Sequence, residues 1–221
     1  MIDTTSSRRL GSQRALCLVA VFATLPLSAC APLVVGGAMV GGTMLAIDRR
    51  TTGTQVEDQT IETKASSRVK ELMGDRAHVN VTSYNRAVLL TGEAPTDADK
   101  AAIEQVVQRV ENVRSTVNEL AVALPSSLST RSNDSYLTTK VKATYVDAKD
   151  LQVNAFKVVT ERGNVYLMGR VTEREATRAT DLARTVSGVQ KVVRVFEIVT
   201  DAELADAQPP KSDSPPPPTR K

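Results

Sequence analysis

One order of segments occurs twice in this chain of 221 residues. Residues 78–122 and 155–198 each hold two stretches of alternating apolar residues around a turn, then a glycine, an amphipathic stretch and a final apolar stretch. Aligning residues 88–92 with residues 165–169 brings the remainder into register with one residue deleted. The repeat predicts two copies of one module of about 65–70 residues, near the lower size for a domain that folds alone.

Each copy is predicted to run in the order helix, strand, strand, helix, strand. The first helix is expected over residues 59–72, because apolar residues recur there at spacings of three and four. Two helices can cover one face of a three-stranded sheet, and the crossover helix lets the last strand pair beside an earlier one. The predicted fold class is therefore α+β, with two tandem αββαβ modules.

Helix starts are predicted from residues that cap well. Asp58 is expected to cap the first helix, Thr96 or Asp97 the second helix, and Asp134 the leading helix of the second copy, which is expected to end at Ala148. The core face of that last helix is predicted to consist of Leu137, Val141, Thr144 and Ala148, with Tyr145 at its margin.

The two leading helices differ on their outer faces. In the first copy the outward positions are polar, whereas the equivalent positions in the second copy are Tyr136, Lys142 and Val146. An outward aromatic and aliphatic pair beside a cation suits a helix that lies at an anionic lipid interface. The alternative interpretation is scattered surface apolar residues, which are common.

The N-terminus is typical of an exported lipoprotein. Basic residues precede a short apolar stretch, and the sequence Leu-Ser-Ala-Cys ending at Cys30 resembles the bacterial lipobox. Cleavage before Cys30 removes Cys17 and acylates Cys30, so no free thiol is expected. Three acyl chains anchor far more firmly than one. The alternative is an ordinary signal peptide with a chance cysteine. Ala31, where Gram-negative lipoproteins retained in the inner membrane tend to carry Asp, implies the outer membrane by that resemblance.

The predicted domain boundaries follow from these patterns. They are a signal peptide at 1–29, a lipidated Gly-rich tether at 30–55, module one at 56–123, a linker at 124–132, module two at 133–200 and a disordered Pro-rich tail at 201–221. A transmembrane segment over residues 31–47 is the weaker interpretation, since the stretch is short and contains two Gly pairs.

No catalytic constellation emerges from the sequence. His78 is the only histidine, which excludes a His-rich metal site, and its place at a strand start predicts a surface residue. Glu173 and Glu175 open a helix, where acids favour the macrodipole, so a paired-carboxylate site is the weaker interpretation. A net charge of +3 is too mild to indicate nucleic-acid binding. No cofactor and no enzymatic activity are expected.

Two stretches of module two, residues 134–142 and 163–175, resemble the BON domain. Residues 48–58 resemble the segment that precedes the first BON domain in dual BON-domain outer-membrane lipoproteins. The resemblance covers about residues 30–200 and implies a three-stranded sheet with two helices in each module, as the pattern predicts.

The resemblance also implies a function. The second BON domain would bind anionic phospholipid, notably phosphatidylglycerol, and the protein would gather at the division site and support outer-membrane integrity. The positions carried over are Tyr136, Thr139, Lys140, Lys142 and Val146. Relatives carry a tryptophan where this chain has Tyr136; tyrosine is also an interface residue but buries less surface, which implies weaker binding.

A second hypothesis belongs to a different class. The modules would form a periplasmic scaffold that contacts outer-membrane assembly machinery or peptidoglycan, with lipid contact incidental. A third, an enzyme, would require turnover by a chain without a usable His or Cys.

Overall fold

The computed structural model describes residues 48–206. The expected signal peptide, Cys30, most of the predicted tether and residues 207–221 lie outside this range. In the described range, none of the helices has the length and apolar content that crossing a membrane requires.

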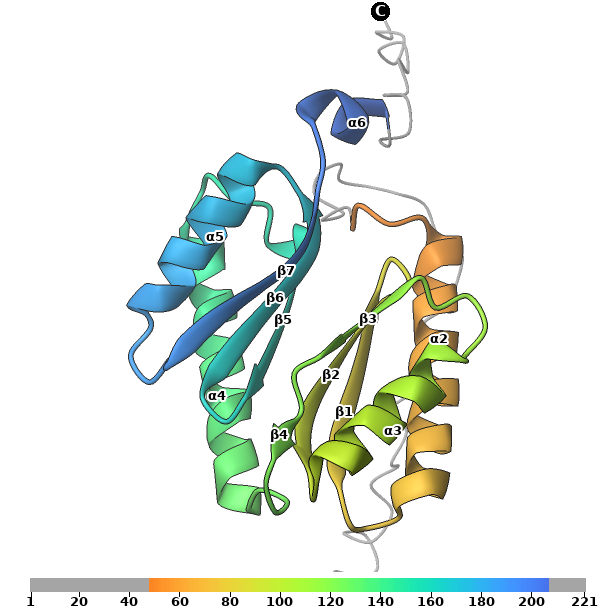
Figure 1. Cartoon of the computed structure of the whole chain (residues 1–221). Coiled ribbons are helices and arrows are strands. Elements are labelled where there is room, and N and C mark those ends of the chain that lie inside the picture. Colours follow the sequence, from red (N-terminus) through yellow and green to blue (C-terminus); the bar gives the residue numbers. More distant parts are fainter. Residues whose placement is uncertain (1–47, 207–221) are drawn as a thin grey trace, which may run out of the picture. The chain divides into compact units, whose positions relative to one another are not determined.

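Both modules have the predicted element order (Figure 1). Module one consists of α2 (Thr52–Met73), β1 (His78–Tyr84), β2 (Ala87–Ala94), α3 (Asp97–Gln108), β3 (Ser115–Asn118) and β4 (Ala121–Val122). Module two consists of α4 (Leu128–Asp147), the short 3-10 helix η1 (Val153–Ala155), β5 (Phe156–Glu161), β6 (Asn164–Val171), α5 (Glu173–Thr185) and β7 (Lys191–Ile198), and is followed by α6 (Asp201–Asp206).

The sheets have the same topology. β2 lies at the centre of the first sheet, antiparallel to β1 and parallel to β3 and β4. β6 lies between β5 and β7 in the same way. The parallel pair in each sheet is joined through the crossover helix, as predicted. The final strand of module one is divided into β3 and β4, which keep the same register with β2, and Leu120 between them is buried in the core.

Each module packs one sheet face against its two helices. In module one the core joins α2, β2 and α3 through residues such as Ile61, Leu90 and Ile103. In module two α5 contributes three buried alanines, and their small size leaves room for Tyr145, which is fully buried rather than marginal. Its hydroxyl donates to the carbonyl of Ala179 at 2.9 Å.

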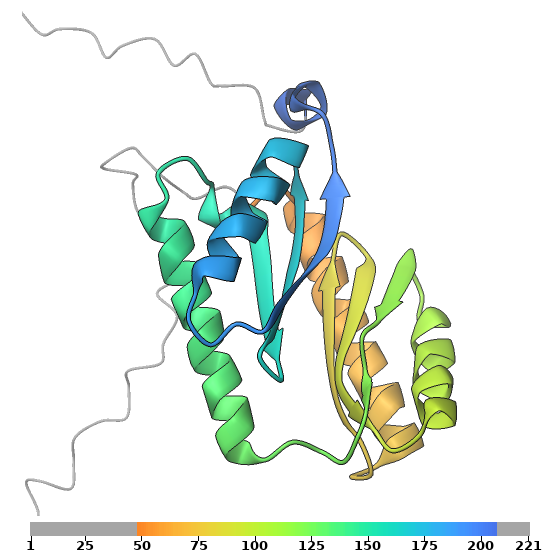
Figure 2. The same ribbon diagram turned by 60° about the vertical axis from the view of Figure 1, so that its left-hand side comes forward.

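The other face of each sheet is covered by the other module (Figure 2). Tyr84 and Leu89 of module one form a buried cluster with Tyr166 and Met168 of module two. This explains why three consecutive residues of β2, Val88, Leu89 and Leu90, are all apolar: both faces of the strand are buried. The two sheets are therefore the inner layers, and the helices are the outer layers.

Two helices begin earlier than predicted. α2 begins at Thr52, capped by Thr51, within the predicted tether. α4 begins at Leu128, capped by Ser127, within the predicted linker. Thr96 caps α3, as predicted. The α6 helix occupies the first residues of the stretch predicted to be a disordered tail.

Asp58 and Asp134 are not N-caps, because both point into their own module from the middle of a helix. Each carboxylate accepts two backbone N–H groups of the hairpin turn that joins two strands, at 2.7–2.9 Å. The turn residues Asn85, Arg86, Arg162 and Gly163 all have positive φ, as a two-residue type I′ turn requires. The same side chain that favours a cap therefore fastens the helix to the hairpin.

Candidate functional site

The outward face of α4 carries the residues that the sequence singled out. Tyr136 is 62% exposed and Val146 is 65% exposed, while Lys142 and Thr139 are also exposed. The hydroxyl of Thr139 donates back to the carbonyl of Ser135, so this residue presents mainly its methyl group. The structure places these four side chains on the solvent side of the helix rather than against module one.

Leu128 belongs to the same face and was missed by the sequence prediction. It is 78% exposed, and helical spacing places it in line with Thr139 and Val146. The predicted helix began at Asp134, so Leu128 was assigned to a linker. Its apolar character at a helical spacing from Val146 was the available signal.

Lys140 differs from Lys142. The Nζ of Lys140 donates to the carbonyl of Ser187 at 2.9 Å and lies 5.6 Å from the centroid of the Tyr136 ring. It is half-buried and holds α4 to the loop after α5 while supporting Tyr136. Within the described part of the chain, Lys142 makes neither an ion pair nor a hydrogen bond, so its charge faces solvent.

No exposed carboxylate lies on α4 between Leu128 and Val146. Asp134 is 4% exposed and engaged with the hairpin turn, and Asp147 is the last residue of the helix. The α2 helix also exposes an apolar residue, Val56 at 62%, but it carries several acids. What distinguishes α4 is the combination of exposed apolar and cationic side chains without an acid among them.

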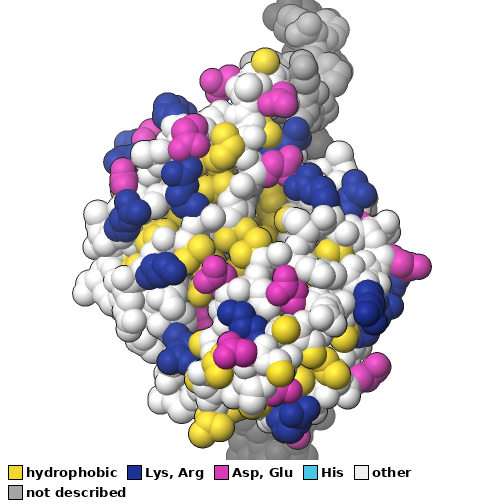
Figure 3. Space-filling model, viewed as in Figure 1, with side chains coloured by type: hydrophobic (Ala, Val, Ile, Leu, Met, Phe, Trp, Pro, Cys, Tyr) yellow, Lys and Arg dark blue, Asp and Glu magenta, His cyan; other side chains and the backbone are white. Residues whose placement is uncertain are grey.

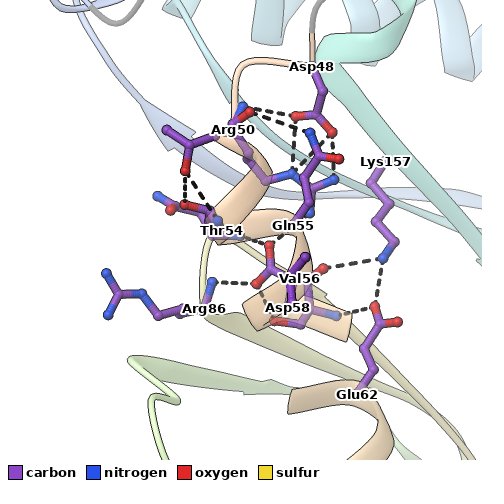
Figure 4. Close-up of polar contacts among 12 residues, drawn as sticks. Asp48, Arg50, Thr54, Gln55, Val56, Asp58, Glu62, Arg86 and Lys157 are labelled. Atoms are coloured by element: carbon purple, nitrogen blue, oxygen red, sulfur yellow. Dashed lines mark hydrogen bonds and ion pairs between the residues drawn. The ribbon is translucent and has the colours of Figure 1, made fainter. Parts of the chain in front are cut away.

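A second polar site lies at the start of the described chain (Figure 4). Arg50 donates to Asp48 and to Asp58, at 2.8 Å for the latter, and its guanidinium stacks over the ring of Tyr84 at 4.2 Å. Burial favours the neutral form of Asp58, but hydrogen bonds from Ser83, the turn and Arg50 hold its pKa below the ordinary value.

Arg49 connects this segment to module two. Its two terminal nitrogens donate to both carboxylate oxygens of Glu175, at 2.7 and 2.8 Å, and one of them donates to the carbonyl of Arg170 at 3.0 Å. The Arg49 hydrogen bond lowers the pKa of Glu175 to about 2. Glu175 also completes a capping box with Thr172. The sequence indicated the helix-start position of Glu175 but not this partner.

His78 is not the surface residue that the sequence predicted. Its side chain is 17% exposed, and its Nδ1 lies 3.1 Å from Glu93 Oε2 and 4.0 Å from Glu161 Oε1. The residue starts β1, as expected, but the opposite sheet face is closed by module two. Burial raises the pKa of Glu161 above its ordinary value.

The face of the molecule drawn in Figure 3 shows no continuous patch of one charge. Acidic and basic side chains alternate on this surface, with apolar side chains between them (Figure 3). This distribution agrees with the mild net charge of +3.

Comparison with known proteins identifies both modules. The BON domain family model matches residues 57–123 and 133–200. The outer membrane lipoprotein DolP of Haemophilus influenzae is 40% identical over 178 residues, which cover 79% of this chain and 91% of that protein. The 21 kDa hemolysin of Actinobacillus pleuropneumoniae is 32% identical over 155 residues, or 69% of this chain and 80% of that protein.

Two solved structures of CdsD, a structural protein of the type III secretion system of Chlamydia trachomatis, also match. They cover 69% and 66% of this chain and 96% and 98% of their own, at 12% and 11% identity and a TM-score of 0.27. Those values are too low to support an inference. The two BON matches and the relative that is 40% identical over most of both chains lead to one conclusion: this chain belongs to the BON-domain family, as a dual BON-domain outer-membrane lipoprotein.

Proposed function

We propose that this lipoprotein binds anionic phospholipid, phosphatidylglycerol in particular, through the outward face of α4. The single observation that supports the proposal is the exposure of Tyr136, Lys142 and Val146 on one helix face that has no exposed acid. Lys140 supports the Tyr136 ring, and Thr139 and Leu128 extend the apolar strip. The protein is non-enzymatic in this proposal and requires no cofactor.

The binding energy has two sources. Apolar side chains that enter the acyl boundary gain about 25 cal/mol per Å² of buried apolar surface. Each Lys near an anionic surface adds about 1 kcal/mol, and salt screens this part. Both contributions act on the same face. Salt is therefore expected to weaken vesicle binding without abolishing it, because the apolar contribution remains.

The anchor sets the geometry of the proposal. Cys30 carries the acyl chains in the outer membrane, and the modules face the periplasm, where α4 contacts the inner leaflet of that membrane or a neighbouring one. By binding lipid there the protein supports envelope integrity, at the division site in particular. Acyl attachment is tested by mass spectrometry of the mature chain, and Cys30→Ser is expected to release it from the membrane.

The test of lipid binding is vesicle flotation with the chain from residue 31 onward, which lacks the anchor. Tyr136→Ala combined with Lys142→Glu is expected to weaken binding to phosphatidylglycerol vesicles at least about tenfold, because an apolar anchor is lost and a charge is reversed. The matched control is Thr60→Ala combined with Lys70→Glu, which makes the same charge change on α2, at the half-buried Thr60 and the exposed Lys70. Equal binding by the α4 variant and the control would overturn the proposal.

A protein-interaction scaffold is the second candidate. It is favoured by the exposed apolar residues where the modules join: Val122 at 49%, Leu124 at 83% and Leu128 at 78%. A partner from the outer-membrane assembly machinery or peptidoglycan would contact this strip. A photo-cross-linker placed at Leu124 in cells would then trap one protein partner in stoichiometric amount. The same chain would show no binding to vesicles in the flotation assay. A cross-linker at Tyr136 that captures lipid would instead favour the first candidate.

A further inference from the structure

A cluster of three metal-ligating side chains lies where the modules meet. His78 of β1 stands opposite Glu93 of β2 in the antiparallel pair, and Glu161 ends β5 of module two. The imidazole Nδ1 is 3.1 Å from Glu93 Oε2 and 4.0 Å from Glu161 Oε1. One ligand atom from each residue lies within 4.8 Å of the other two.

The carboxylates of this cluster are buried. Glu93 is fully buried and Glu161 is 4% exposed. The Oε2 atom of Glu93 also accepts from the backbone N–H of Ser126 at 3.1 Å, but its Oε1 atom is buried with no hydrogen-bond partner in the described part of the chain. A buried oxygen of this kind costs free energy unless something pairs with it.

The two glutamates of the cluster have no ion-pair partner other than His78 among the described residues. Among residues 48–206, no Lys or Arg forms an ion pair with Glu93 or Glu161. Glu161 Oε2 accepts a hydrogen bond from the Asn80 amide at 2.7 Å. The alignment of the two modules places Arg170 at the position of Glu93, and at the other end of the interface Arg50 pairs with Asp58. One end of the interface is therefore neutralised by arginines, and the other holds two buried carboxylates beside one imidazole.

We propose that His78, Glu93 and Glu161 bind a divalent transition-metal ion, zinc in particular, which fastens module one to module two. One imidazole nitrogen and two carboxylate oxygens form a donor set that suits zinc, whereas magnesium and calcium prefer oxygen alone. Zinc–ligand bonds of about 2.0–2.1 Å place tetrahedral ligands about 3.4 Å apart. The separations of 3.1 and 4.0 Å, and the third, which is no more than 4.8 Å, reach that geometry with shifts of no more than about 1.5 Å.

Access and the fourth ligand come from a neighbouring pocket. A pocket of about 340 Å³ is lined by His78 and Glu161 together with Asn80, Asp134 and Arg131, whose guanidinium donates to Ser126. It provides an entry path and room for a water as the fourth ligand. The site joins strands of both modules, so the bound ion acts as a structural cross-link and is independent of the outward face of α4.

The test uses the untagged chain from residue 31 onward, which contains no cysteine and a single histidine. Zinc chloride is titrated by calorimetry and by NMR of the ¹⁵N-labelled imidazole, whose signals belong to His78 alone. The expected results are one ion per chain, a zinc-dependent shift of the Nδ1 resonance, and a zinc-dependent rise in the thermal unfolding midpoint. Magnesium chloride is expected to produce none of these changes.

The variants Glu93→Gln and Glu161→Gln separate a metal site from a structural hydrogen-bond cluster. Each keeps the side-chain shape and is expected to weaken zinc binding at least about tenfold, because loss of even an outer-shell partner has an effect of that order. Glu173→Gln, which removes an exposed carboxylate, is the matched control and is expected to bind like the unaltered chain. Far-UV circular dichroism confirms the fold of each variant.

Two outcomes would overturn the proposal. One is an unchanged His78 resonance at millimolar zinc, which is the result expected if the carboxylates only share a proton. The other is equal zinc affinity for the unaltered chain and both glutamine variants, which would assign the ion to a different place.

Discussion

Removal of the charge of Glu175 tests how strongly the segment before α2 is bound to module two. The substitution Glu175→Gln keeps an acceptor for the capping box, since glutamine also serves there. It leaves the buried guanidinium of Arg49 without its ionic partner; the two side chains are 8% and 9% exposed in the present structure. A buried charge that loses its partner is strongly unfavourable.

The magnitude follows from the pKa of Glu175, which is lowered from 4.5 to about 2. At about 1.4 kcal/mol per pH unit, this displacement corresponds to about 3 kcal/mol. The hydrogen bonds that the backbone N–H and the hydroxyl of Thr172 donate to the carboxylate supply part of it, and the glutamine oxygen still accepts them. We therefore expect the variant to lose about 2 kcal/mol of unfolding free energy at neutral pH.

The pH dependence has a definite sign. Because the folded-state pKa of Glu175 is depressed, its stabilisation is fully present above 4.5 and is lost as the pH falls toward about 2. The glutamine of the variant does not titrate, so the stability of the variant lacks this pH dependence. The difference between the two proteins is therefore expected to shrink by about half between neutral pH and about pH 3.

The assay is urea unfolding followed by far-UV circular dichroism at several pH values. The matched control is Glu173→Gln, since Glu173 lies on the same helix turn, is 63% exposed and pairs with Arg194. Exposed pairs contribute little, so the control is expected to lose less than about 1 kcal/mol. The reasoning fails if the two variants lose equal stability, or if the Glu175 difference is constant across the pH range.

Two further substitutions test how α4 is held in module two. Asp134→Asn leaves one acceptor oxygen for two turn N–H groups and is expected to cost about 1–3 kcal/mol in urea unfolding, whereas Asp147→Asn on the same helix should change stability by less than about 0.5 kcal/mol. Tyr145→Phe removes the hydrogen bond to Ala179 and is expected to cost about 1 kcal/mol in the same assay. Tyr136→Phe, on an exposed side chain, should cost nothing measurable, and an equal loss for both tyrosines would contradict the assigned burial.

Much of the fold was predictable because it depends on local patterns. The apolar spacing of α2 and α4, the alternation of the strands and the duplication together determine the αββαβ order, which the structure confirms. The starts of α2 and α4 were wrong by several residues because aspartate suits both an N-cap and a hairpin turn, whereas the Thr96 cap of α3 was predicted correctly. Asp58 and Asp134 satisfy the turn, and this was not visible in the sequence without knowing which turn lies beside which helix.

The candidate site was predictable in part. The outward positions of Tyr136, Lys142 and Val146 follow from helical spacing, and the structure leaves them exposed; that they bind lipid stays a prediction. The surroundings of His78 and Arg49 were not predictable, because their partners come from the other module. Pairing across an interface depends on which sheet faces meet, and no local pattern encodes that.

The shared cluster of Tyr84, Leu89, Tyr166 and Met168 has a consequence for protein engineering. To express one module alone, the sheet face that the other module normally covers must first be redesigned with hydrophilic residues. Otherwise the exposed apolar strands are expected to cause self-association. Moving α4 into another protein therefore means transplanting both modules, since each one covers the apolar sheet face of the other.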